Sequence, residues 1–235
     1  MTKETSSARR AARLGIALAV SAAILVDLMF LVDIYAGDRT IELFDLDEGG
    51  LVTWASSSAT FAVAVIALLL SFIDPTQRWR GVALAAGTAY MSFDDAEILH
   101  ERLASEVTDA LGIAESYDQA VWPIFYFPLL AGVALLLLQL GQRTPAARRL
   151  ILVGLGCLAL GVVLEVAGIG LDKLDYELES WPRTVEALLE EGIELAGWIL
   201  IATGAAVRVI ILAGSGPADP PIDASSPTPT AVGSE

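Results

Sequence analysis

Stretches of about twenty mainly apolar residues recur along this chain of 235 residues, and they limit its fold more than any other feature. An α-helix of roughly twenty residues is needed to cross the hydrocarbon layer of a bilayer, which is about 30 Å thick. Inside that layer backbone polar groups need partners within the protein, so helices and closed barrels are the structures that span it. Only 18% of the residues are charged, against roughly a quarter in soluble domains. We therefore predict an all-α, polytopic membrane protein.

The apolar runs predict a bundle of six membrane-spanning helices. Their approximate ranges are 14–35, 52–73, 81–99, 122–140, 150–171 and 185–212. A cleaved signal peptide is the alternative for the first run, but that run continues past Ala19 to Val32, which is too long for a typical signal. The predicted organisation is an N-terminal segment, a six-helix transmembrane domain and a disordered tail rich in Pro, Ser, Ala and Asp, over 1–13, 14–213 and 214–235.

The basic residues predict which way these helices cross the membrane. Ten of the fourteen fall on one side: Lys3, Arg9, Arg10, Arg13, Arg78, Arg80, Arg143, Arg148, Arg149 and Arg208. The other side has Arg39, Arg102, Lys173 and Arg183. Lys and Arg collect in the cytoplasmic loops of membrane proteins. We therefore predict that both termini are cytoplasmic (N-in/C-in) and that the protein lies in the inner cell membrane.

Charge and cysteine content exclude several classes of protein. The net charge of −15 gives no basic surface for phosphates, so nucleic acid is not expected as a partner. The single cysteine, Cys157, lies in an apolar run and excludes disulfide and CxxC chemistry. The single histidine, His100, excludes His-rich metal sites. The lipid bilayer is the predicted partner, and a homo-oligomer or another membrane partner stays open.

Ionisable residues inside the apolar runs, or within one helical turn of their ends, are the candidate functional residues. Such side chains are costly in a bilayer and usually face the interior of a bundle or a water-filled cavity. At 1.5 Å per residue, the acids of four predicted helices reach a similar depth in the outer half of the membrane. We therefore predict one outward-facing cluster made of Asp27, Asp94, Glu97, His100, Glu165, Glu190 and Glu194.

Helical spacing favours the same cluster. Asp94, Glu97 and Glu101 follow i, i+3, i+7 spacing, so they share one face of a continuous helix. His100 lies beside Glu97 on that face. Glu165 falls on a stripe of glycines, and small residues favour close helix packing in membranes. We therefore expect Glu165 to face other helices rather than lipid.

The predicted cluster has no lysine or arginine, so its carboxylates need protons or a bound cation. Two carboxylates 4 Å apart repel by about 4 kcal/mol at an effective dielectric constant near 20. Oxygen ligands with at most one imidazole suit Mn, Mg, Ca or Fe(II), so a divalent metal ion is the candidate cofactor. A proton-handling cluster and a passive water-filled vestibule remain alternatives. The favoured ligands are Asp94, Glu97, His100 and Glu194, followed by Asp27, Glu165 and Glu190.

Two segments resemble uncharacterised bacterial multi-pass membrane proteins. Residues 91–101, Met-Ser-Phe-Asp-Asp-Ala-Glu-Ile-Leu-His-Glu, are similar to a Ser-x-Asp…His-Glu segment in such proteins. Residues 190–194, Glu-Glu-Gly-Ile-Glu, resemble a later Glu-Glu-Gly-x-Glu segment. The resemblance implies no activity, but it favours one site formed by both segments.

The sequence leaves three functions open. The leading hypothesis is a membrane protein whose carboxylate and histidine cluster binds a cation or exchanges it with protons. A structural or sensory envelope protein without catalytic or transport activity is the first alternative, and a membrane-embedded metalloenzyme is the second. Glu97 to His100 forms a Glu-x-x-His element like those of di-metal helix bundles, but the chain has no second one. HExxH and GxSxG motifs are also missing, so enzyme activity stays undecided.

Overall fold

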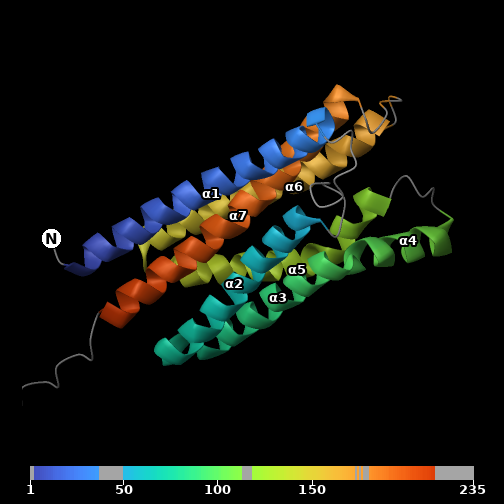
Figure 1. Cartoon of the computed structure of the whole chain (residues 1–235). Helices are drawn as coiled ribbons and strands as arrows, with labels where there is room; N and C mark the ends of the chain where they lie inside the picture. Colours follow the sequence, from blue (N-terminus) through green and yellow to red (C-terminus); the bar gives the residue numbers. More distant parts are fainter. Residues whose placement is uncertain are drawn as a thin grey trace, which may run out of the picture.

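The computed structural model describes residues 3–36, 50–112, 118–172, 174, 176 and 180–214, and nearly all of them are helical. This confirms the all-α prediction (Figure 1). The elements in chain order are α1 (Lys3–Ala36), α2 (Leu51–Ile73), the short 3-10 helix η2 (Pro75–Gln77), α3 (Arg78–Glu97), α4 (Leu99–Leu111), α5 (Asp118–Gly141), α6 (Pro145–Asp172) and α7 (Trp181–Gly214).

Five of the described helices are long and apolar enough to cross a membrane: α1, α2, α5, α6 and α7. The third predicted span, 81–99, falls on α3, which is not among them. Charged residues at both ends of α3, from Arg78 and Arg80 to Asp94 and Glu97, make it less apolar than the others. The structure therefore supports a membrane protein with five candidate spans, and the count of six is not confirmed.

The helix over the third predicted span is broken, so the prediction of one continuous helix there is wrong. α3 ends at Glu97, and α4 begins at Leu99. Ile98 between them has a φ of 58° in the left-handed region, where a β-branched residue is an outlier. Glu101 therefore does not follow Asp94 and Glu97 on one continuous helix.

The structure describes most of the predicted N-terminal segment but almost none of the predicted C-terminal tail. α1 begins at Lys3, so most of the predicted N-terminal segment 1–13 is already helical and continuous with the first span. The tail predicted over 214–235 lies outside the described residues, apart from Gly214 at the end of α7.

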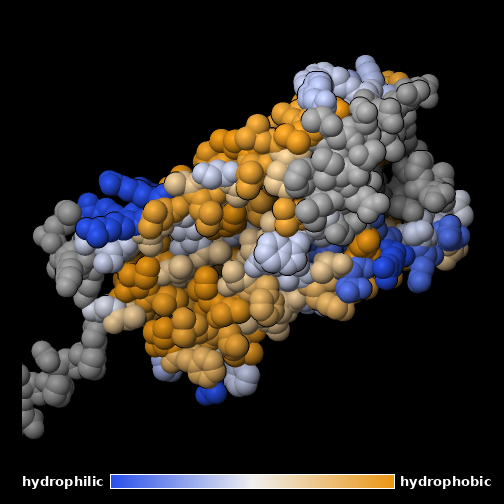
Figure 2. Space-filling view, in the orientation of Figure 1, coloured by the Kyte–Doolittle hydropathy of each residue, from blue (hydrophilic) through white to orange (hydrophobic). Residues whose placement is uncertain are grey.

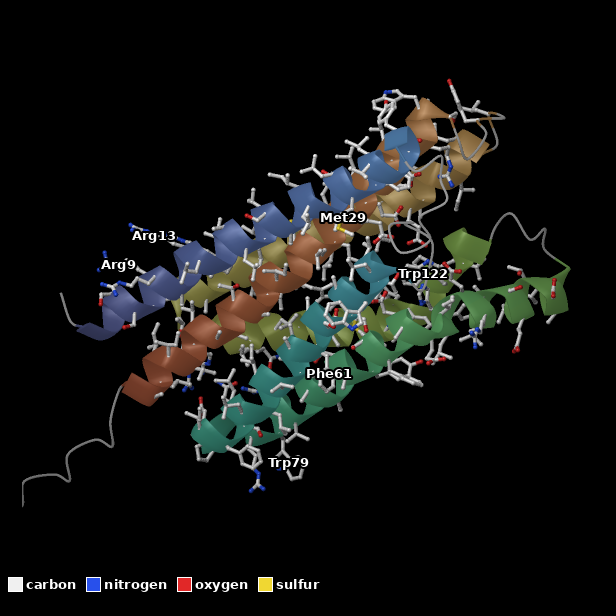
Figure 3. All side chains as sticks on the ribbon, in the orientation of Figure 1. Arg9, Arg13, Met29, Phe61, Trp79 and Trp122 are labelled. Carbon is white, nitrogen blue, oxygen red and sulfur yellow. The ribbon has the colours of Figure 1, made fainter. Side chains whose placement is uncertain are left out.

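The helices form two groups that meet at α7. α1 and α6 pack along α7, while α2 pairs with α3 and also contacts α7. The start of α1 and the end of α7 lie at the same end of the bundle (Figure 1). Arg9 and Arg13 lie at that end, and Trp79 marks the start of α3 (Figure 3). Side chains from α2, α3, α5, α6 and α7 fill the core between the groups, including Val63, Leu84, Leu137, Ile151 and Ile201.

Apolar side chains cover the outside of the bundle as well as its core. Hydrophobic residues extend across the middle of the face drawn in Figure 2. Leu14, Phe72 and Phe127 are 71%, 69% and 66% exposed, respectively. So much exposed apolar surface is unfavourable in water and is rare on monomeric soluble proteins. The surface is therefore compatible with a lipid bilayer.

Glycines allow α6 and α7 to approach closely. A Cβ atom on Gly154 would lie 2.6 Å from the carbonyl oxygen of Gly197 and 2.7 Å from Cγ1 of Ile201. Backbone and core atoms occupy that space, so any side chain at Gly154 forces the two helices apart. Gly156, on the same helix, has open space around the corresponding position.

We predict that Gly154→Ala lowers the free energy of unfolding by about 1–3 kcal/mol, the usual cost of overpacking a core. Gly156→Ala is the matched control and should leave stability unchanged or slightly higher, because alanine favours helices. Thermal unfolding of both variants in detergent checks this. Equal stabilities would show that the α6–α7 crossing is not as close as described.

A buried ion pair joins α7 to the turn after α2. Arg208 Nη2 lies 3.1 Å from Asp74 Oδ2, and their side chains are only 3% and 13% exposed. The hydrogen bond from Thr76 lowers the pKa of Asp74 most, burial raises it, and Arg208 lowers it further. The net pKa lies below the ordinary value of 3.8. The pair therefore stabilises the fold above that pH, and its contribution is lost as the pH falls through the folded pKa.

We predict that Asp74→Asn destabilises the protein by about 3 kcal/mol, because it leaves the buried Arg208 charge without a partner. Arg208→Met should cost less, since Asp74 lies closer to the surface and is hydrated more easily. Asp109→Asn, at an exposed position on α4, is the control. Unfolding in detergent at neutral pH measures all three variants. A larger loss in Arg208→Met than in Asp74→Asn would contradict this account.

Candidate functional site

A cavity of about 160 Å³ lies where α2, α3, α4, α5, α6 and α7 meet, and acidic and aromatic side chains dominate its wall. No lysine or arginine lines it. The acidic members of the wall are Asp94, Asp95, Glu101, Glu165, Glu190, Glu191 and Glu194. Its aromatic members are His100, Trp122, Tyr126 and Trp198. We call this the acidic cavity.

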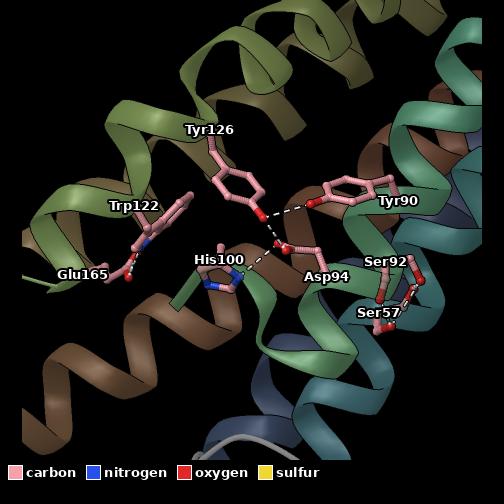
Figure 4. Close-up of polar contacts among 8 residues, drawn as sticks. All are labelled: Ser57, Tyr90, Ser92, Asp94, His100, Trp122, Tyr126 and Glu165. Atoms are coloured by element: carbon pink, nitrogen blue, oxygen red, sulfur yellow. Dashed lines mark hydrogen bonds and ion pairs between the residues drawn. The ribbon is translucent and has the colours of Figure 1, made fainter. Parts of the chain in front are cut away.

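Asp94 is the most buried acid in the cavity wall and connects three helices. Its side chain comes from α3 and is 8% exposed. Tyr126 of α5 donates its hydroxyl to Asp94 Oδ1 at 2.6 Å, and His100 Nδ1 of α4 lies 3.0 Å from Oδ2 (Figure 4). The Tyr90 hydroxyl lies 3.0 Å from that of Tyr126 and extends this network along α3. Both carboxyl oxygens of Asp94 are therefore occupied by protein groups.

Glu165 of α6 has a single neutral donor. The Trp122 indole nitrogen donates to Glu165 Oε1 at 2.5 Å (Figure 4). A neutral donor orients a carboxylate without cancelling its charge. Glu165 therefore presents a fixed but uncompensated acidic group to the cavity.

Three rings pack against each other beside these acids. The His100 and Trp122 ring centroids are 4.8 Å apart, and Tyr126 lies 5.9 Å from His100 and 6.0 Å from Trp122. All three pairs meet at steep angles, from 64° to 80°. Such edge-to-face contacts are favourable for aromatic rings. We call these three residues the aromatic corner, and it fixes one wall of the cavity.

Two serines attach α2 to α3 just before Asp94. Ser57 donates to the Ser92 carbonyl oxygen at 2.7 Å, and Ser92 donates to the Ser57 carbonyl oxygen at 2.8 Å (Figure 4). Both side chains are buried. This reciprocal pair holds the position of α3 two residues before Asp94.

Helix α7 contributes two further carboxylates one turn apart. Glu190 and Glu194 are partly buried and follow i, i+4 spacing on the face toward the cavity. The nearest cation on this helix, Arg183, donates to Glu186 at 2.6 Å and does not line the cavity. The α7 acids are therefore not neutralised by an arginine in the cavity wall.

The structure brings together five of the seven residues predicted from sequence: Asp94, His100, Glu165, Glu190 and Glu194 all line the acidic cavity. Glu97 does not line it and is exposed, because α3 ends there and the chain changes direction at Ile98. Glu97 therefore lies outside the acidic cavity, and a role for it as a ligand stays a prediction.

Asp27 lies on α1, away from the cavity wall. Its Oδ1 atom lies 3.2 Å from the place where a Cβ atom of Gly192 would be, so it faces α7. Gly192 is about half a turn away from both Glu190 and Glu194 around α7, which puts Asp27 against a different side of that helix. Asp27 is not part of the acidic cavity.

The sequence interpretation missed the aromatic residues of the site. Trp122 and Tyr126 lie near the start of a predicted span, where aromatic residues are common at the membrane interface, and so they did not stand out. Their i, i+4 spacing places both residues on one face of α5. That spacing is the sequence signal by which their shared role could have been found.

The arrangement does not form a compact metal centre. Among the residues that the structure describes, no three His, Cys, Asp or Glu side chains are grouped closely enough to hold one metal ion. The acids are instead distributed around the cavity on α3, α4, α6 and α7. Chemically, the cavity combines several carboxyl groups with hydrogen-bond donors and aromatic surface.

The comparisons with known proteins give one match. Residues 12–209 match a family model described as Domain of unknown function (DUF8692). Neither the curated proteins nor the solved structures contain a match.

The pairing of His100 with Asp94 gives a prediction that can be measured on the single histidine of the chain. Burial by itself lowers the pKa of His100, but the hydrogen bond and charge of Asp94 outweigh it, with smaller effects of Glu101 and Glu165. The net pKa lies above the ordinary value of 6.5. The stability gained from the pair is complete below that pH and is lost as the pH rises through the folded pKa.

We predict that NMR titration of histidine-labelled protein gives one signal with a pKa above 6.5, and that Asp94→Asn lowers it. Glu97→Gln is the matched control, because Glu97 is exposed and outside the cavity. An equal decrease in both variants would show that Asp94 has no special contact with the imidazole.

Proposed function

We propose that this chain, a member of the DUF8692 family of unknown function, binds a cation in its acidic cavity and exchanges that cation with protons. The observation that carries the proposal is the cavity wall itself. Four predicted carboxylates and the histidine line one cavity, and among the described residues no lysine or arginine lines it.

Electrostatics supports a positively charged occupant. Carboxylates close together in a poorly hydrated interior cannot all remain charged without compensation. Protons and a bound cation are the two ways to neutralise them, and occupation by one displaces the other. Binding a cation to such a cluster therefore releases protons, which is the elementary step of exchange.

The position of the cavity between helix groups also favours exchange. Its acids come from α3 and α4 on one side and from α6 and α7 on the other. Membrane transporters commonly place their sites between two helix groups that move against each other. Small shifts of α2, α3 and α4 relative to α6 and α7 would change access to the acidic cavity.

We further propose that α3 is the sixth span and that both termini are cytoplasmic in the inner cell membrane. Ten basic residues on one side of the predicted spans support this orientation. It places the acidic cavity toward the external face, because its members lie in the first half of α7 and the second half of α3.

The experiment measures proton release from the purified full chain in lipid nanodiscs, in weakly buffered solution. The added probes are Na⁺, Ca²⁺, Mn²⁺ and 1,4-diaminobutane, which cover monovalent, divalent metal and organic cations. We expect at least one probe to release protons and to shift the His100 NMR signal. In Asp94→Asn and Glu165→Gln the release should fall at least several-fold, because each variant removes a titratable ligand.

Glu97→Gln is the matched control and should release protons like the natural chain. If no probe causes release, or if Glu97→Gln and Glu165→Gln lose it equally, the proposed function is wrong. A structural or sensory role would then be the remaining interpretation.

A further inference from the structure

We infer that the cation which the acidic cavity accepts is a small organic ammonium ion, a short aliphatic diamine, rather than a single metal ion. This inference rests on the proposed function and specifies its ligand class. Three observations carry it: the size of the cavity, its aromatic wall and the distribution of its acids.

The size of the cavity matches a molecule rather than a bare ion. Its volume is about 160 Å³. A protein cavity of about 150 Å³ holds one benzene molecule, which has six non-hydrogen atoms. 1,4-Diaminobutane has the same number of non-hydrogen atoms, whereas a bare metal ion would fill only a small part of this volume.

The aromatic wall suits an alkylammonium ion. Trp122, Tyr126 and Trp198 line the cavity together with His100. Ring faces attract ammonium groups through their quadrupole, and more strongly when water is excluded. They also offer apolar surface to a methylene chain. A hydrated divalent metal ion gains little from such a wall, because it prefers oxygen ligands.

The acids are spread around the cavity rather than gathered at one point. Asp94, Glu165 and Glu194 come from three different helices, and no three ligating side chains of the described residues group around one position. One metal ion needs several ligands at nearly equal short distances. A diamine has two separated charges, and each can pair with a different carboxylate.

A buried hydroxyl adds an acceptor at the edge of this wall. Ser56 is 4% exposed, and its hydroxyl interacts with Glu194, which lines the cavity. The Ser56 carbonyl oxygen accepts from Thr60, which lines the cavity one turn further along α2. The remaining lone pair of the Ser56 hydroxyl can accept an N–H bond of a primary ammonium group, which a quaternary ammonium ion lacks.

The test compares 1,4-diaminobutane with Mn²⁺ on the full chain in lipid nanodiscs, by calorimetric titration. We expect the diamine to bind the natural chain more tightly than Mn²⁺ does. Tyr126→Leu, which removes a ring, should weaken diamine binding about tenfold and affect Mn²⁺ much less. Tyr126→Phe keeps the ring and removes the hydroxyl that donates to Asp94, so its loss should be smaller and similar for both probes.

Trp79→Leu is the control variant, because Trp79 is 80% exposed at the start of α3, far along that helix from Asp94. Size-exclusion chromatography and thermal unfolding verify that each variant is folded. Tetramethylammonium, which has no N–H donor, should bind more weakly than the diamine. Together these comparisons separate the ring, the hydroxyl and the ammonium hydrogens.

The outcomes distinguish this inference from the proposed function. Proton release and binding with Mn²⁺ but not with the diamine would overturn the inference and leave cation exchange in place. Equal diamine affinities of Tyr126→Leu and Tyr126→Phe would also overturn it, because the ring would then have no role. Binding of neither class of cation would refute both.

Discussion

The site depends on one buried carboxylate, Asp94, which holds together helices from three parts of the chain. Its two oxygens contact Tyr126 on α5 and His100 on α4. A charged group in this interior is costly without such partners, and hydrogen bonds from neighbouring helices compensate that cost. The aromatic corner follows from this network, because His100 and Tyr126 both bind Asp94 and Trp122 packs against both of their rings.

The break at Ile98 is what lets His100 reach Asp94. A left-handed residue costs roughly 1–2 kcal/mol, and Ile is poorly suited to it. The His100 contact with Asp94 and the ring contacts with Trp122 and Tyr126 offset that cost. A strained backbone next to a polar cavity is a common feature of functional sites. Here it changes the direction of the chain so that α4 packs beside α5.

The two ends of α7 have opposite electrostatic character. Toward its N-terminal end, Glu190 and Glu194 face a cavity whose described wall has no lysine or arginine. Toward its C-terminal end, Arg208 is buried and paired with Asp74. The pair fixes α7 to the turn between α2 and η2 at that end. The charge of Arg208 thus takes part in a fixed contact, whereas Glu190 and Glu194 lie at the acidic cavity.

The sequence by itself determined the helical class, the membrane environment and most of the acidic residues of the site. Long apolar runs permit little else, and an acid within them must avoid lipid, so Asp94, Glu165 and Glu194 stood out. Only the tertiary structure decided which of those acids meet. Helical spacing grouped Glu97 with Asp94, but Glu97 is exposed at the last residue of α3 and lies outside the cavity wall. Spacing also contains no information on which side of α7 faces α1, where Asp27 lies. The tertiary structure also decided the aromatic corner, because contacts between α4 and α5 depend on how the chain packs after Ile98. Such packing is a non-local property that helical periodicity does not encode.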